Sequence, residues 1–178
     1  MSRTSPFRTL LLAALTAAPN LVACSSDSAS PTDPNSAAGV VLEGDATVAQ
    51  LDAFLQHEAT EWAWAGGQFD TPDAQAILAA DTPQRFSWHA DPADFAQGDT
   101  ANDAVMTHLL EFSASSKSTP LRVFTTLSEY TPDTVAWQKL IAVGEPITVN
   151  LTTGTFVGAD VPKDGGPFIG QALTFTIE

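Results

Sequence analysis

The sequence is poor in cysteine, in tyrosine and in basic residues. Its only cysteine is Cys24, so no disulfide can form within the chain. Seven lysines and arginines stand against 21 acidic residues, which gives a formal net charge of −14. This charge excludes nucleic acid and anionic lipid head groups as expected partners, because both are polyanions that need a basic surface. The most apolar stretch, residues 10–18, is too short to form a membrane-spanning helix.

The N-terminal residues have the order of a secretion signal. Arg3 and Arg8 precede the apolar stretch, which is followed by the tetrapeptide Leu21-Val22-Ala23-Cys24. This tetrapeptide resembles the lipobox of bacterial lipoproteins, in which the chain is cut before the cysteine and the cysteine is acylated. The resemblance implies that residues 1–23 are a signal peptide and that Cys24 becomes the lipid-carrying N-terminus. The alternative is an ordinary signal peptide with an unpaired thiol near its cleavage site.

The resemblance to lipoproteins also predicts where the protein is located. Acyl chains on Cys24 would attach it to a membrane, since each buried methylene contributes about 0.8 kcal/mol and more than one chain gives stable anchoring. In enterobacterial lipoproteins an aspartate directly after the cysteine retains the protein in the inner membrane. Here that position is Ser25, so we expect a lipid-anchored cell-envelope protein in the outer membrane rather than the inner one.

Composition divides the rest of the chain into a tether and one domain. Residues 24–39 are rich in Ser, Pro and Asp and contain no large apolar side chain, which is typical of a disordered linker. As a flexible coil this tether would reach roughly 20 Å. Residues 40–178 have the size of a single domain. After the signal, five basic residues face 21 acidic ones, a formal charge of −16.

Two segments of the domain predict short helices. Thr47 and Gln50 have the spacing of a capping box, and the helix that they open is expected to end near His57. Its predicted apolar stripe consists of Val48, Leu51, Phe54 and Leu55. A second helix is predicted from Pro132, as its first residue, to a left-handed stop at Gly144. The side chains expected to dock it are Val135, Trp137, Leu140 and Ile141.

The other apolar segments have the patterns of β-strands. Alternation within residues 84–90 places Phe86 and Trp88 on one face of a strand and Ser87 and His89 on the other. Residues 104–113 form a continuous apolar run, which indicates a strand covered on both faces. Further strands are predicted at residues 61–65, 121–127, 147–152 and 173–177, with the last two as neighbours.

These patterns together indicate a mainly β fold, an antiparallel β-sandwich with two short helices. The segment Pro83-Gln84-Arg85-Phe86-Ser87-Trp88 resembles the early Phe-x-Trp strand of fibronectin type III-like modules in bacterial envelope proteins. The segment Trp137-Gln138-Lys139-Leu140, followed by Gly144 and an alternating strand, resembles their late strands. The resemblance covers roughly residues 83–177 and implies a fibronectin III/Ig-like binding or spacer module. The helix before Gly144 is longer than the usual connection at that position.

No catalytic, cofactor or metal motif is predicted. His57, His89 and His108 could in principle bind zinc, but none belongs to a ligand motif, and the helical His-Glu-x-x-His pattern fails after His57-Glu58. The aspartates within residues 91–103 do not have the spacing of an EF-hand loop. No Gly-x-Ser-x-Gly nucleophile elbow is present in the sequence.

The tryptophans raise one binding hypothesis. Trp88 and Trp137 are expected in the core, whereas Trp62 and Trp64 would project to the same side of one strand. There the two rings could either cover the core or form a flat platform on which a sugar stacks. Trp62 and Trp64 are therefore the candidate ligand-binding residues.

The sequence predicts a non-enzymatic binding or structural module at the cell envelope. Its membrane partner is the bilayer, reached through lipidated Cys24, and a glycan or another envelope protein is the expected ligand. A carbohydrate-binding module that uses Trp62 and Trp64 is the alternative. A secreted hydrolase or metalloenzyme is the third interpretation.

Overall fold

The structure is a computed structural model that describes residues 37–61, 66–90, 104–162 and 164–178. Cys24, residues 24–36 of the predicted tether, Trp62 and Trp64 lie outside the described residues, as do the aspartates within residues 91–103.

The fold is mainly β with two short helices, as predicted. The strands are β1 (Val40–Glu43), β2 (Thr60–Glu61), β3 (Gln68–Thr71), β4 (Ile77–Leu78), β5 (Phe86–His89), β6 (Ala104–Ala114), β7 (Lys117–Thr125), β8 (Glu129–Tyr130), β9 (Ile147–Val157) and β10 (Phe168–Ile177), and the helices are α1 (Val48–Gln56) and α2 (Thr134–Ile141).

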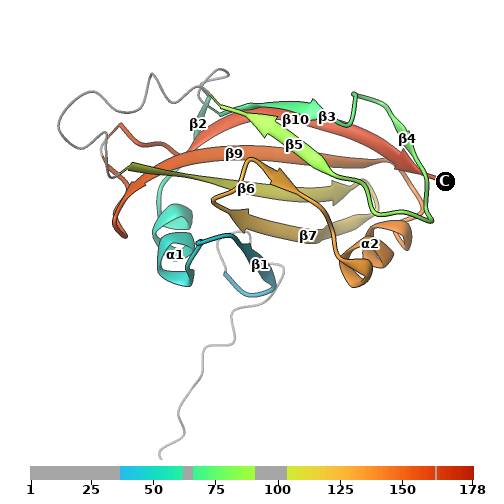
Figure 1. Cartoon of the computed structure of the whole chain (residues 1–178), viewed down its shortest axis with the longest axis horizontal. Coiled ribbons are helices and arrows are strands. Elements are labelled where there is room, and N and C mark those ends of the chain that lie inside the picture. Colours follow the sequence, from blue (N-terminus) through green and yellow to red (C-terminus); the bar gives the residue numbers. More distant parts are fainter. Residues whose placement is uncertain (1–36, 62–65, 91–103, 163) are drawn as a thin grey trace, which may run out of the picture.

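The strands form a large and a small sheet (Figure 1). The large sheet has the order β1-β7-β6-β9-β10-β2, with β4 also paired to β10, and the small one has the order β3-β5-β8. The long strands β7, β6, β9 and β10 are antiparallel, and β9 and β10 are the neighbours that the sequence predicted. The expectation of a wholly antiparallel fold is wrong at the edges, because β1, β2 and β4 run parallel to their partners. These short strands reach the sheet through long connections, so no hairpin sets their direction.

The main core lies between the two sheets. Phe86 of the small sheet meets Phe112 and Phe175 of the large sheet, in each case with ring centroids 5.3 Å apart. Trp88 and Trp137 are both 2% exposed in this core, as predicted. The aromatic rings thus hold the sheets face to face, and burial of apolar surface of this kind dominates folding energetics.

A second, smaller core lies on the opposite face of the large sheet, under α1. It contains Leu51 and Phe54 from the helix and Leu109, Phe124 and Phe156 from the sheet. Helix α1 packs in this second core, whereas Phe86 and Trp88 of β5 lie in the main core on the other face of the large sheet. Strand β6 is therefore covered on both faces, with Leu110 in the main core and Leu109 in the second one. This confirms the interpretation of its continuous apolar run.

Helix α1 begins and ends where its local signals predict. Thr47 is the N-cap, its capping box with Gln50 is complete, and His57 is the C-cap. The prediction for Val48 is wrong, because its side chain is 55% exposed. The buried arc of the helix runs from Gln50 through Phe54 to Leu51, and Val48 lies roughly 110° away from the centre of this arc at 3.6 residues per turn.

Helix α2 starts later than predicted. Asp133 is its N-cap and accepts a hydrogen bond of 2.7 Å from the backbone N–H of Ala136. Pro132 therefore precedes the helix instead of opening it. Gly144 has φ +69°, the left-handed conformation that was expected after the helix. Val135 was expected to dock but is 64% exposed, because the buried arc is formed by Ala136, Trp137 and Leu140.

Candidate functional site

Two of the three histidines lie at the protein surface in separate parts of the fold. His57 caps the C-terminus of α1 and is exposed. His89 is on the outer face of β5, where its Nδ1 lies 2.7 Å from Asp70 Oδ1 on β3. Within the described ranges, no group of three or more His, Cys, Asp or Glu side chains is placed to hold a metal ion.

His108 lies in the interior of the large sheet. Its side chain is 1% exposed, its Nδ1 is 2.9 Å from Thr153 Oγ1, and its ring meets Trp88 edge to face at 5.4 Å. Burial lowers the pKa of His108 from 6.5 to about 4, because a charged imidazolium would lose its hydration. His108 is therefore neutral near pH 7, and its surroundings are those of a side chain packed in the core.

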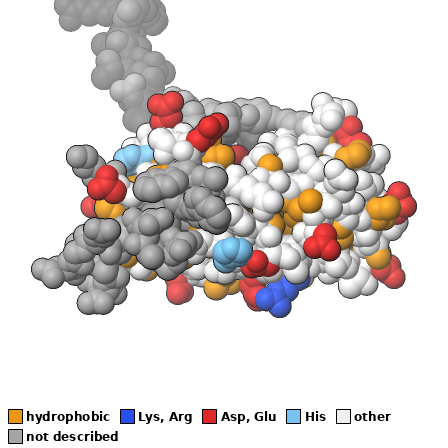
Figure 2. Space-filling view, turned by 90° about the horizontal axis from the view of Figure 1, so that it is seen from above, with side chains coloured by type: hydrophobic (Ala, Val, Ile, Leu, Met, Phe, Trp, Pro, Cys, Tyr) orange, Lys and Arg blue, Asp and Glu red, His pale blue; other side chains and the backbone are white. Residues whose placement is uncertain are grey.

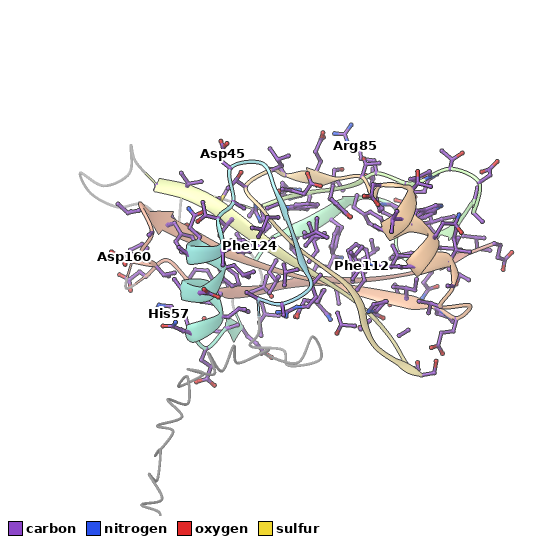
Figure 3. The ribbon with its side chains drawn as sticks, turned by 90° about the horizontal axis from the view of Figure 1, so that it is seen from below. Asp45, His57, Arg85, Phe112, Phe124 and Asp160 are labelled. Carbon is purple, nitrogen blue, oxygen red and sulfur yellow. The ribbon has the colours of Figure 1, made fainter. Side chains whose placement is uncertain are left out.

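A groove lies beside α1, and both apolar and ionisable side chains line it. It has a volume of about 300 Å³ and lies on the face of the large sheet that carries the second core. Helix α1 contributes to the lining of this groove, and Figure 3 shows the helix ending at His57. Phe124 lies beside the helix in this view, and Phe112 lies farther along the sheet. The lining residues are Phe54, Leu55, His57, Glu58, Ala59, Leu109, Glu111, Thr152 and Pro167.

The apolar walls of the groove continue the second core. Phe54 packs edge to face against Phe124, with centroids 5.3 Å apart, and its ring lies close over Gly154 of β9. A Cβ at Gly154 would come within 2.8 Å of that ring, so a glycine is needed for the helix to approach the strand this closely. The helix and the sheet therefore fix the position of the Phe54 ring at the edge of the groove.

The charged part of the groove depends on a cross-strand pair. Glu111 on β6 is opposite Arg122 on β7, and Arg122 Nε lies 3.0 Å from Glu111 Oε1. The Arg122 side chain is 6% exposed and that of Glu111 is 31% exposed, so the carboxylate reaches the groove while the guanidinium stays under it. Glu58, beyond the end of α1, adds a second carboxylate at the rim. Among the described residues that line the groove there is no lysine or arginine.

Sequence reasoning missed this site because its members come from distant segments. The signal that could have pointed to it is one residue of opposite charge in each of two otherwise apolar strands, Glu111 and Arg122. Their pairing follows from the register of the β6–β7 hairpin, which places them face to face. Cys24, Trp62 and Trp64, the residues that the sequence did single out, are not in the described ranges, so their predicted roles stay predictions.

Comparison with known proteins gives no relative: no protein-family profile, no curated sequence and no solved structure matches this chain. Among the helices of the described residues, neither α1 nor α2 has the length and hydropathy needed to cross a membrane.

Proposed function

We propose that this protein is a lipid-anchored envelope lipoprotein whose β-rich domain is a non-enzymatic binding module. The observation that carries the proposal is the tetrapeptide ending at Cys24, preceded by a charged and apolar leader and followed by a polar tether. Acylation gives the only cysteine a role, since an unpaired thiol in an oxidising compartment would be open to intermolecular pairing. Ser25, in place of aspartate, favours the outer membrane.

The surface of the domain supports attachment through the lipid rather than through the protein. Figure 2 shows acidic side chains scattered over the face that carries the small sheet, with few basic ones. Among described side chains, Arg85 is paired with Glu129 and Arg122 with Glu111. A domain of this charge is repelled by anionic head groups, and a tether of roughly 20 Å would hold it clear of them.

We also propose a fibronectin III/Ig-like fold for the sandwich. Phe86 and Trp88 on one face of β5, packed against long antiparallel strands, support it. The parallel edge strands β1, β2 and β4 depart from that pattern. A crystal structure of this protein with a wholly antiparallel Greek-key order would support that fold, and one with the same parallel edges would count against it.

Fractionation of cells tests the lipid anchor. The wild-type chain is expected in the outer-membrane fraction, and Cys24→Ser is expected in the soluble fraction because serine cannot carry the thioether-linked lipid. Ser25→Ala is the matched control and should leave the protein in the membrane. Cys24→Ser that stays in the membrane, or a wild-type chain that is soluble, would overturn the proposal and favour the ordinary signal peptide.

The carbohydrate-binding alternative rests on Trp62 and Trp64 and stays a prediction. Glycan arrays probed with the wild-type chain and with Trp62→Ala test it. A glycan signal that disappears in the variant supports a sugar platform, whereas a blank array for the wild type removes this alternative.

A further inference from the structure

We propose that the groove beside α1 binds a small organic cation with an apolar body, such as an arylalkyl ammonium. This inference rests on the proposed binding role of the domain and names the class of its ligand. The volume of about 300 Å³ is at the lower end of the range of small-molecule pockets, which suits a ligand with one ring or a short alkyl chain.

The apolar body of the ligand is matched by one wall of the groove. Phe54, Leu55 and Leu109 form this wall, and Pro167, the residue before β10, also lines the groove. Phe54 and Leu109 are 2% and 4% exposed, so their positions are set by the second core. A wall that is fixed before binding lowers the entropic cost of ordering the site.

The charge of the ligand is set by the carboxylates that line the groove. Two carboxylates, Glu58 and Glu111, line the groove, and one buried guanidinium, that of Arg122, is paired with Glu111. The remaining negative charge sits on a chain with a formal net charge of −14. An ammonium group is attracted by this field and an anion of the same size is repelled.

The depth of Glu111 strengthens this selectivity. Its side chain is about two-thirds covered, with an exposed fraction of 31%, and it lies between apolar neighbours such as Leu109. An ion pair formed there is less screened by water than one on an open surface. Thr152 on the neighbouring strand β9 adds a hydroxyl. It pairs with Leu109 of β6 on one side and with Ile169 of β10 on the other. Glu111 and Thr152 together offer acceptors for the N–H groups of an ammonium.

The groove is distinct from the other paired charges of the domain. His89 and Asp70 lie on the outer face of the small sheet, where no described cavity adjoins them, and Arg85 and Glu129 are half-exposed partners. The side chains of both pairs are about half exposed or more, with fractions of 49% to 63%. The groove differs from these two pairs because, among the described residues, it combines an apolar wall with a partly buried carboxylate.

Three probes of similar size test the inference: 2-phenylethylammonium, 2-phenylethanol and 3-phenylpropionate. The protein is the chain with Cys24→Ala, which cannot carry the thioether-linked lipid. Titration followed by amide chemical shifts is expected to show saturable one-to-one binding of the cation, with shifts at Leu109 and Thr152. The alcohol and the anion are expected to bind at least about tenfold more weakly.

Charge-neutral variants locate the site. Glu111→Gln and Glu58→Gln are each expected to weaken binding of the cation, Glu111→Gln by about tenfold and Glu58→Gln by less, because Glu58 is more exposed. Glu129→Gln, on the small sheet, is the matched control and should bind as before. Glu58 is exposed, so its variant keeps the test valid even if Glu111→Gln unfolds.

Equal affinity for the three probes, or shifts that avoid Leu109 and Thr152, would overturn the inference. It would also be overturned by a cation affinity that neither variant changes. These outcomes are independent of the lipid anchor, because the fractionation of Cys24→Ser does not depend on what the groove binds.

Discussion

His108 donates a hydrogen bond from Nδ1 to Thr153 Oγ1, across 2.9 Å in the interior of the large sheet. The direction follows from the next bond, in which the Thr153 hydroxyl gives its only proton to the carbonyl oxygen of Gly66 at 2.7 Å. Thr153 can therefore only accept from His108, which carries its proton on Nδ1. These two hydrogen bonds link β6 to β9, and β9 to Gly66, which lies just before β3 of the small sheet.

The free energy of unfolding should depend on pH through His108. Its pKa is about 4 in the folded protein and 6.5 in the unfolded chain, so the unfolded chain binds more protons between these values. Stability is then complete above pH 6.5 and falls as the pH is lowered toward 4. Between pH 7 and pH 4.5 the loss due to this residue is about 2 kcal/mol. Urea unfolding at the two pH values measures it.

His108→Asn removes the titrating group while keeping a side-chain N–H donor. The difference in unfolding free energy between the two pH values should shrink by about 2 kcal/mol in this variant. The interpretation fails if wild type and His108→Asn lose the same stability on acidification.

Thr153→Val should destabilise the protein by about 2 to 3 kcal/mol, because it leaves two buried groups, His108 Nδ1 and the carbonyl oxygen of Gly66, without their partner. Equilibrium unfolding in urea at pH 7 measures the effect. Thr174→Val is the control: its hydroxyl bonds to Thr148 at an exposed site, so a change within about 0.5 kcal/mol is expected. Similar losses for both variants would argue against the buried chain of hydrogen bonds.

Gly170→Ala should cost about 3 kcal/mol or more. A Cβ at this position would lie 2.2 Å from the carbonyl oxygen of Gly66, so two backbone segments would have to separate. Gly158→Ala serves as the comparison, because no atom lies within 4 Å of its Cβ and only its φ of +66° is strained. That strain is worth about 1 kcal/mol. Thermal melting of both variants shows which one loses more stability. A larger loss for Gly158→Ala than for Gly170→Ala would refute the close approach of the Gly66 and Gly170 backbones.

Thr47→Ala should lower stability by about 1 kcal/mol, since it removes the side chain that accepts from the backbone N–H of Gln50 at 3.2 Å. Chemical unfolding provides the measurement. Val48→Ala, one residue later and 55% exposed, is expected to stay within about 0.5 kcal/mol of wild type. A larger loss for Val48→Ala than for Thr47→Ala would contradict the observed orientation of α1.

The local features of this fold could be predicted because their causes are local. The capping box of Thr47 and Gln50 lies within one helical turn, and its partners are three residues apart. The alternation of Phe86 and Trp88 against Ser87 and His89 follows from the two-residue period of a strand. The strands β9 and β10 were expected as neighbours because both have one apolar face, and Leu173 indeed pairs with Val149.

The candidate site could not be predicted in the same way. Glu111 and Arg122 are read from the sequence as isolated charges within apolar runs, and only the hairpin register brings them together. Gly66 and Gly170 are separated by more than half of the chain, yet their backbones touch. Neither contact leaves a periodic signal, because each depends on how separate elements are placed in space.

The sequence by itself determined the caps and the strand periods, since short-range sterics and hydrogen bonds decide these. The tertiary structure alone decided which arc of each helix is buried, as Val48 and Val135 show, and which edge strands run parallel. It also decided that Glu111 meets an apolar wall beside α1. The physical reason is that burial depends on the whole packing arrangement, and the same local pattern is compatible with several such arrangements.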